Sequence, residues 1–309
     1  MKRCFLTGGT GFIGSAVTQL LADEGTEVGL FTRNRSKARE LFDFHNLTLF
    51  DGDLHDSDAL TNAVKTFKPD TVIHLGWAGI TGVDRDDNIQ LKNQQATIDL
   101  AQVAIRTGVK SFIGLGSQAE YGPKQGVISE HEPCNPVSLY GASKLASQCL
   151  TQQLCRIGNV RFAWVRLFSC FGPRDTPSFM IPTVIESLLN GHRPSLTAAH
   201  QMWDFLYVDD AARAIATVAK AKTRGDAGQG IFNLGSGTSV PLKDVIEQLR
   251  DLIDDNLPLG FGDLPYGNNQ IMHLEADTTR LKQIGWDPVT PLKQGLATTI
   301  NWHRAKREE

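Results

Sequence analysis

The 309-residue sequence lacks the features that mark several classes of protein. Its net charge is only −3 and no block of like charge occurs, which argues against nucleic acid as a partner. No apolar run reaches the roughly 18 residues of a membrane-spanning helix, and the first residues lack the apolar segment and cleavage site of a signal peptide. We therefore expect a cytoplasmic protein with no membrane or nucleic-acid partner.

Cysteine is scarce and irregularly placed. The five cysteines are odd in number, and none belongs to a Cys-x-x-Cys pair. This usage argues against a disulfide framework and against a zinc site, so we predict no metal. The remaining composition, with 41% hydrophobic and 21% charged residues, is ordinary for a globular protein whose length is enough to bury a sizeable core.

The most informative local pattern lies at the start of the chain. Arg3–Thr7 is predicted to be a short buried strand, and an apolar-periodic helix runs to about Asp23. Between them, Gly8, Gly11 and Gly14 permit a tight turn that can approach a pyrophosphate, while the helix N-terminus supplies free N–H groups. Strand, glycine turn and helix in this order predict dinucleotide binding, the alternative being a glycine-rich turn without a ligand.

The end of the second predicted strand, Thr26–Thr32, indicates which dinucleotide binds. An NAD site usually has an acidic residue here, which binds the ribose 2′-hydroxyl. Thr32 takes that place, and Arg33 and Arg35 follow. Because guanidinium groups bind a 2′-phosphate that a carboxylate would repel, NADP(H) is favoured and NAD remains possible. The alternative is two solvated arginines that open a surface helix.

Alternating strands and helices continue beyond this point. Further strands are predicted at Leu47–Phe50, Thr71–Leu75, Lys110–Leu115 and Asn159–Leu167. This alternation predicts an α/β fold, a Rossmann-like doubly wound parallel sheet whose ligands lie beyond the carboxyl ends of the strands. Ser117 follows one such end.

The alternation weakens after the sixth strand. We predict a dinucleotide-binding domain over residues 1–172, completed by about 203–235, where more sheet-and-helix scaffold is expected. Residues 173–202 and 236–309 are expected to form a smaller C-terminal substrate-binding lobe.

Tyr140 and Lys144 are four residues apart on a helix predicted to begin near Val137. They therefore share one face. A tyrosine normally titrates near ~10, too high for fast proton transfer at neutral pH, and a neighbouring ammonium favours phenolate. The pair predicts an acid/base group, although a half-buried Tyr beside a solvated Lys would look the same.

Several motifs in this order resemble the extended short-chain dehydrogenase/reductase family, which includes nucleotide-sugar epimerases, dehydratases and ketoreductases. Besides the glycine turn and Tyr140-x-x-x-Lys144, they include Asp53-Leu54, a Ser-x-x-x-Tyr-Gly segment that starts at Ser117, and Phe205–Asp210. A C-terminal Gly-Trp-x-Pro at 285–288 is also similar, so the resemblance covers essentially the whole chain. It implies a homodimer formed through the helices near 88–107 and 137–157.

The resemblance implies a role for each matching position. The catalytic residues would be Ser117, which binds the substrate oxygen, Tyr140 as general acid/base, and Lys144, which lowers the tyrosine pKa and holds the nicotinamide ribose. The resemblance and the end of the second predicted strand together give the expected cofactor-binding positions: Gly8, Gly11, Phe12, Ile13, Gly14, Thr32, Arg33, Arg35, Asp53, Leu54, Leu75, Gly76, Trp77, Asn93, Tyr140, Lys144 and Phe168. The implied substrate-binding positions are Ser117, Gln118, Ser169 and Arg174.

Departures from the family pattern reduce the number of activities expected for this chain. Where 4,6-dehydratases have Thr-Asp-Glu or a variant that keeps the Glu, this chain has Ser117-Gln118-Ala119. Gln118 and Ala119 cannot remove a proton, and Glu120 is displaced by one residue, so a dehydratase is not expected.

Two arginines that relatives use for the substrate diphosphate are missing. Trp203 replaces one, and Gly267-Asn268-Asn269 stands where the other is often found. Arg174 or Arg193 could substitute for them.

The leading hypothesis is an NADPH-dependent nucleotide-sugar 4-ketoreductase acting on a nucleotide-activated 4-keto-6-deoxyhexose. The alternative is a nucleotide-sugar 4-epimerase with tightly held NAD, against which the Thr32-Arg33 strand end weighs. A non-catalytic dinucleotide-sensing protein is a third possibility, less favoured because the chain retains Tyr140 and Lys144.

Overall fold

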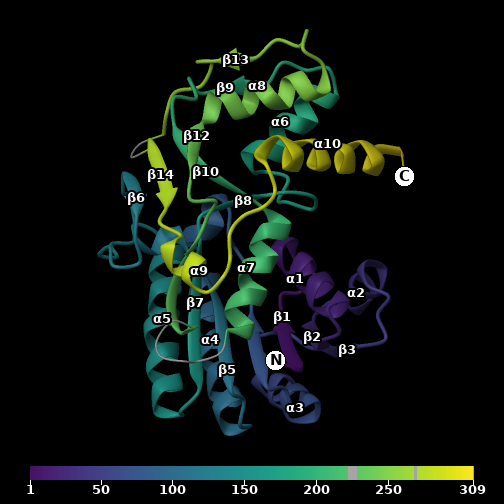
Figure 1. Cartoon of the computed structure of the whole chain (residues 1–309), viewed down its shortest axis with the longest axis vertical. Helices are drawn as coiled ribbons and strands as arrows, with labels where there is room; N and C mark the ends of the chain where they lie inside the picture. Colours follow the sequence, from purple (N-terminus) through teal and green to yellow (C-terminus); the bar gives the residue numbers. More distant parts are fainter. Residues whose placement is uncertain (222–227, 268–269, 309) are drawn as a thin grey trace.

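The computed structural model describes residues 1–221, 228–267 and 270–308. Its main layer is a seven-stranded parallel sheet with the strand order β11-β7-β5-β4-β1-β2-β3 (Figure 1). The strands of this sheet are β1 (Arg3–Thr7), β2 (Glu27–Thr32), β3 (Leu47–Asp51), β4 (Thr71–His74), β5 (Ser111–Ser117), β7 (Arg161–Leu167) and β11 (Gly230–Leu234). The predicted α/β class and doubly wound sheet are confirmed.

Helices cover both faces of this sheet. They are α1 (Phe12–Asp23), α2 (Arg35–Leu41), α3 (Ser57–Phe67), α4 (Ile89–Arg106), α5 (Leu139–Ile157) and α7 (Val208–Lys220). The alternation of side chains along β1 shows why both faces are apolar. Cys4 and Leu6 pack in one cluster with α1 and α7, whereas Phe5 packs in the other with α3, α4 and α5. A central parallel strand is therefore a continuous apolar run.

A second, smaller sheet lies beyond the carboxyl ends of the main strands. Its order is β12-β10-β14-β6, and β8 also pairs with β10. These strands are β6 (Gly126–Ile128), β8 (Ser169–Phe171), β10 (Met202–Tyr207), β12 (Ser239–Pro241) and β14 (His273–Ala276). The segment near 204–208 was expected to belong to the main scaffold. It instead forms β10 in this second sheet, whereas the segment near 231–234 joins the main sheet as β11.

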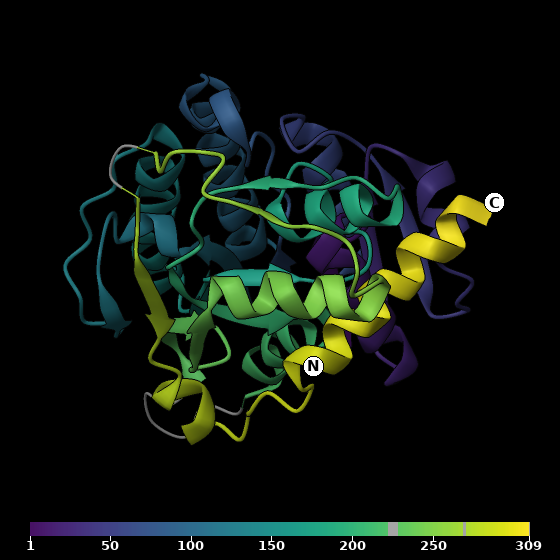
Figure 2. The ribbon, with the colours of Figure 1, turned by 90° about the horizontal axis from the view of Figure 1, so that it is seen from above.

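Helices α6 (Met180–Leu189), α8 (Leu242–Ile253) and α10 (Leu292–Glu308) form an apolar lobe with this sheet. The view from above shows α8 and α10 crossing over the rest of the molecule (Figure 2). The remaining short elements of the described residues are β9 (Ser195–Leu196), β13 (Gly260–Phe261), α9 (Thr279–Gln283) and the 3₁₀ helices η1 (Gly82–Asp86) and η2 (Gln118–Glu120). None of the described helices is long and apolar enough to cross a lipid bilayer.

Candidate active site

A cleft of about 830 Å³ lies where the carboxyl ends of the main strands meet the lobe. It is lined by the glycine turn, the ends of β2, β4, β5 and β7, the start of α5, and residues of the second sheet and α6. Every predicted site residue lines this cleft except Arg35 and Arg174. The structure therefore brings together residues from positions 8 to 169 of the sequence.

The glycine turn has the close packing that a pyrophosphate site requires. Gly8 adopts φ +74°, and a Cβ there would lie 2.5 Å from the backbone nitrogen of Gly76. A Cβ on Gly14 would lie 2.0 Å from the carbonyl oxygen of Gly8. The following helix begins with Gly11 as N-cap, without a capping side chain and without an acidic residue in its first turn. Its first N–H groups thus remain available for an anion, and this cradle fits a dinucleotide.

The end of the cleft beside β2, where the adenosine of a dinucleotide was predicted, carries cations. Arg33 and Lys37 line it, and the Arg33 side chain is 72% exposed with its Nη1 3.7 Å from Asp53 Oδ2. Thr32 is buried and its hydroxyl accepts a hydrogen bond from the Asn34 amide at 3.1 Å. Arg35, also predicted for this site, lies outside the lining and pairs with Asp51 at 2.8 Å. Arg33 lies before the N-cap of α2, Asn34, whereas Arg35 is the first residue of the helix.

The predicted catalytic residues lie together in the cleft. Ser117 ends β5, and Tyr140 sits in the first turn of α5, where the Ser117 hydroxyl acts to lower the pKa of the phenol. Lys144, one turn further along the same helix, donates from Nζ to the Leu115 carbonyl at 2.6 Å. Its Nζ lies 3.8 Å from the centroid of the Trp77 ring and 6.0 Å from that of the Tyr140 ring. Ser138 caps this helix by accepting a hydrogen bond from the Gly141 amide, which fixes where α5 starts.

Burial controls the protonation of both helix residues. Burial raises the pKa of Tyr140, and the Ser117 hydroxyl and the Arg85 guanidinium oppose this effect. Burial lowers the pKa of Lys144 to about 7, partly offset by Glu120. The sequence assigned the opposing role at Tyr140 to Lys144, whereas in the structure Ser117 and Arg85 fill it.

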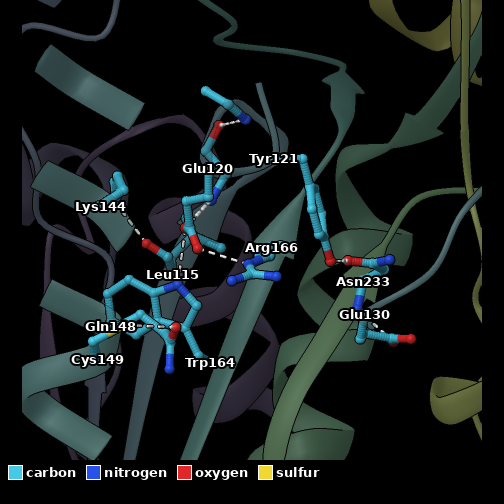
Figure 3. Close-up of polar contacts among 12 residues, drawn as sticks. Leu115, Glu120, Tyr121, Glu130, Lys144, Gln148, Cys149, Trp164, Arg166 and Asn233 are labelled. Carbon is cyan, nitrogen blue, oxygen red and sulfur yellow. Dashed lines mark hydrogen bonds and ion pairs between the residues drawn. The ribbon is translucent and has the colours of Figure 1, made fainter. Parts of the chain in front are cut away.

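Glu120 does not face the cleft as a base. Its side chain is fully buried, and it accepts hydrogen bonds from the Ser117 amide and Trp164 Nε1, each at 2.9 Å, and from Arg166 Nε at 2.7 Å (Figure 3). The Trp164 ring fits above Gly114 of β5, where an added Cβ would lie 2.2 Å from a ring carbon. Glu120 is thus a structural anion that fixes the backbone of Ser117.

His74 is likewise structural. The ring is buried, Nδ1 lies 2.7 Å from the Thr7 hydroxyl, and Nε2 lies 3.0 Å from the Thr97 hydroxyl. Burial, with a smaller contribution from Lys144, lowers the pKa of His74 to about 3. It is therefore a neutral strand residue at physiological pH.

The loop after β4 is held by two buried amides on α4. Gln90 accepts from Trp77 Nε1 at 2.8 Å and donates to the carbonyls of Gly79 and Asp84. Asn93 donates to the Ala78 carbonyl at 2.9 Å. The loop consequently holds the Trp77 ring against Tyr140, with the two rings nearly perpendicular and 6.2 Å apart.

The part of the cleft where substrate residues were predicted lies beside β8. Phe168 and Gln118 line it, and Ser169 accepts a hydrogen bond from Trp203 Nε1 at 2.5 Å. Asp175 also lines it, and burial raises its pKa to about 7.

Arg174, expected at this end, does not line the cleft and adopts φ +68°. Arg193 is instead paired with Asp263 at 2.5 Å. Of the segment Gly267-Asn268-Asn269, Asn268 and Asn269 lie outside the described residues. Within the described residues, no group of three or more His, Cys, Asp or Glu side chains could hold a metal ion.

Sequence reasoning missed Lys37, Arg85 and Asp175, all of which line the cleft. Lys37 lies in the first turn of α2, directly after the Thr32-Arg33 strand end that the sequence pointed to. Arg85 lies in a short 3₁₀ helix and Asp175 in an irregular segment, and neither offers a sequence periodicity that indicates direction.

A parallel sheet with a glycine turn, and a Ser-Tyr-Lys cluster at its carboxyl edge, define a dinucleotide-dependent enzyme of the short-chain dehydrogenase/reductase type. A family model, "NAD dependent epimerase/dehydratase family", matches residues 4–235. The chain belongs to this family.

Individual relatives cover most or all of the chain. A dTDP-glucose 4,6-dehydratase of Streptomyces griseus is 31% identical over 77% of this chain and 73% of its own length. A UDP-glucose 4-epimerase of Mycolicibacterium smegmatis is 28% identical over 99% of this chain and 100% of its own. Among solved structures, a UDP-N-acetylglucosamine 4-epimerase from Methanobrevibacter ruminantium M1, in complex with UDP-N-acetylmuramic acid, is similar with a TM-score of 0.89, 26% identity and 99% coverage of both chains.

Proposed function

We propose that this enzyme is an NADPH-dependent ketoreductase that reduces the C4 carbonyl of a nucleotide-activated 4-keto-6-deoxyhexose. One observation carries the proposal: Ser117 and Tyr140 share the cleft, while the carboxylate closest to them in sequence, Glu120, is buried in an ion pair. The cluster can therefore transfer a proton to or from a sugar oxygen. Positions 118 and 119 carry no acid to eliminate water, as the related dehydratases require.

The protein's part in the reaction follows from the geometry. NADPH, when bound, supplies the hydride to C4. Tyr140 donates its proton to the carbonyl oxygen, so that the C=O group becomes CH–OH, and Ser117 orients that oxygen by a hydrogen bond. Lys144 would hold the nicotinamide ribose, replacing its present contact with the Leu115 carbonyl. Proton return to Tyr140 completes the cycle.

The adenosine end supports NADP(H) as the cofactor. Arg33 and Lys37 line this end, and the only ion pair of Arg33 among the described residues is a 3.7 Å contact with Asp53 that leaves it mostly exposed. A 2′-phosphate would find two cations there. We propose that Asp53 contacts the adenine amino group and that the lobe formed by 173–202 and 236–309 holds the nucleotide sugar.

A 4-epimerase is the second candidate. The M. smegmatis and M. ruminantium relatives cover the whole chain and are named 4-epimerases, and the matching family is described as NAD dependent. An epimerase would use Ser117, Tyr140 and Lys144 to oxidise and re-reduce one sugar without releasing its cofactor.

Cofactor release separates the two candidates. The protein is purified without added cofactor and titrated with NADPH and NADH. A ketoreductase binds NADPH reversibly and more tightly than NADH, and Arg33→Ala removes this preference. Arg35→Ala is the matched control, because Arg35 lies outside the cleft. NAD⁺ retained through purification would instead establish the epimerase.

Catalysis is tested with Tyr140→Phe. The variant should bind NADPH as the wild type does but lose roughly 10²–10⁴-fold in reduction of 4-keto sugars, since the proton donor is gone. Unchanged turnover would contradict the role of Tyr140.

We also propose a homodimer formed through α4 and α5. Leu91, Leu150 and Ile157 on these two packed helices are unusually exposed for large apolar side chains, at 48%, 45% and 75%. A second copy with the same face would bury them.

A further inference from the structure

Arg85 lies directly over the residue that carries the proton. It belongs to the short 3₁₀ helix η1 (Gly82–Asp86), and its guanidinium carbon is 4.6 Å from the centroid of the Tyr140 ring. Arg85 lines the cleft, and within the described part of the chain it makes no ion pair or hydrogen bond. A cation that contacts only an aromatic face is available to respond to charge on that ring.

The surrounding structure fixes this placement. The Gln90 side chain, completely buried, bonds the carbonyls of Gly79 and Asp84, at the start of the loop and beside Arg85. Asp86 accepts a hydrogen bond from the Leu139 amide at 2.8 Å, which ties η1 to the first turn of α5. Two helices thus hold the segment on either side of Arg85, so the cation is positioned before substrate binds.

The other charged groups around Tyr140 do not duplicate it. Glu120 of η2 (Gln118–Glu120) acts on Tyr140 in the opposite sense and is already paired with Arg166 of β7. Lys144, on the same helix as Tyr140, is directed to the Leu115 carbonyl.

The remaining charges on η1 and just after it are Asp84, Asp86 and Asp87, whose side chains are exposed. Ser117 also lowers the pKa of Tyr140 but carries no charge. Arg85 is therefore the guanidinium that faces the Tyr140 ring.

We propose that Arg85 is a positioning residue for proton transfer, acting through Tyr140 by stabilising the phenolate left when the proton moves to the sugar oxygen. This inference rests on the proposed acid/base role of Tyr140. A guanidinium over the ring face attracts a phenolate more strongly than a neutral phenol, because the negative charge is partly delocalised into the ring. The benefit arises as charge develops during the reaction.

Loss of Arg85 should affect the two reaction directions differently. Without Arg85 the phenolate is less stable, so the pKa of Tyr140 rises. Reduction needs the phenol, and its basic limb against pH should move upward. Oxidation of the alcohol needs the phenolate, and its acidic limb should also move upward. At neutral pH, an increase of about 1 in the pKa of Tyr140 should slow oxidation by about tenfold.

The test uses Arg85→Met, which keeps much of the side-chain length without the charge, and Arg85→Lys, which keeps the charge. Arg106→Met is the control, since Arg106 lies at the far end of α4. We expect Arg85→Met to move both limbs to a pH about 1 higher, with Arg85→Lys close to wild type. A raised KM with unmoved limbs would show that Arg85 binds substrate instead, and would overturn the proposal.

A second measurement does not depend on turnover. The ultraviolet absorbance of tyrosinate is followed against pH in the wild type, in Arg85→Met and in Tyr140→Phe. The difference between the wild-type and Tyr140→Phe curves is the contribution of Tyr140, one of the four tyrosines. The Tyr140 transition should occur at higher pH in Arg85→Met. If the wild type reduced no 4-keto sugar, the proposed substrate would be wrong, but the absorbance titration would still test Arg85. A Tyr140 transition at the same pH in Arg85→Met and in the wild type would refute the role of Arg85.

Discussion

Replacing Glu120 with Gln should destabilise the fold far more than a change of one oxygen to one nitrogen suggests. The glutamine keeps the size of the side chain and can still accept hydrogen bonds from the Ser117 amide and Trp164 Nε1. What it loses is the negative charge that faces Arg166. That guanidinium is only 2% exposed, so water cannot replace the carboxylate.

The expected loss follows from the burial of both partners. Removing one partner of a buried ion pair costs about 3–5 kcal/mol, because the remaining charge stays desolvated and uncompensated. Such a loss is a large fraction of the ~5–15 kcal/mol that stabilises a typical domain. Arg166 keeps its contact with the Tyr121 ring, where its guanidinium carbon lies 4.4 Å from the centroid, but a ring face cannot replace a carboxylate.

Urea unfolding measures this loss. Asp51→Asn is the control, because its ion pair with Arg35 is about half exposed and should contribute only ~0–1 kcal/mol. The double variant Glu120→Gln/Arg166→Met should recover much of the stability, since the uncompensated charge is removed. A loss for Glu120→Gln no larger than that of the control would refute the view that Arg166 depends on Glu120.

Three other sites can be tested by substitution. Gly14→Ala should weaken NADPH binding at least ~10-fold while the protein stays folded, because its Cβ would lie 2.0 Å from the Gly8 carbonyl oxygen; unchanged affinity by titration would argue against this cradle. Burial raises the pKa of Asp175 to about 7, so the folded state holds a proton that the unfolded state releases near ~4, and stability is lost at this group as pH rises between these values. Asp175→Asn should therefore become more stable than the wild type as pH rises from ~4 to ~7, by on the order of 2–4 kcal/mol at ~7. The same difference in urea midpoint between the variant and the wild type at both pH values would contradict this prediction. Leu150→Glu should convert the proposed dimer to a monomer in sedimentation, and a monomeric wild type would end the dimer proposal.

The fold was predictable where the pattern is local. The strand, glycine turn and helix at 3–23 depend on residues close in sequence, and the structure places them as expected. The second sheet was not, because β10 has the same apolar character as a main-sheet strand and its partners β12 and β14 lie far along the chain. β6 has only three residues, too few for an alternating pattern.

The candidate site shows the same division. The spacing of Tyr140 and Lys144 places both on one helix face, and the structure brings them into the cleft. Arg85 has no such spacing, because η1 reaches Tyr140 only through the packing of the loop on α4 and α5. The difference between Arg33 and Arg35 likewise depends on the exact start of α2, which sequence reasoning fixes poorly.

The position of β11 in the chain also affects how this protein is made. The strand β7 ends at Leu167, but its outer neighbour β11 comes only from residues 230–234, after part of the second sheet has been synthesised. At ~5–20 residues per second, the growing chain exposes an unpaired β7 edge for several seconds. The helix α7, which packs on α1, is also synthesised after β7. An emerging chain that ends near residue 172 therefore presents an open sheet edge, a point at which chaperones would be expected to bind.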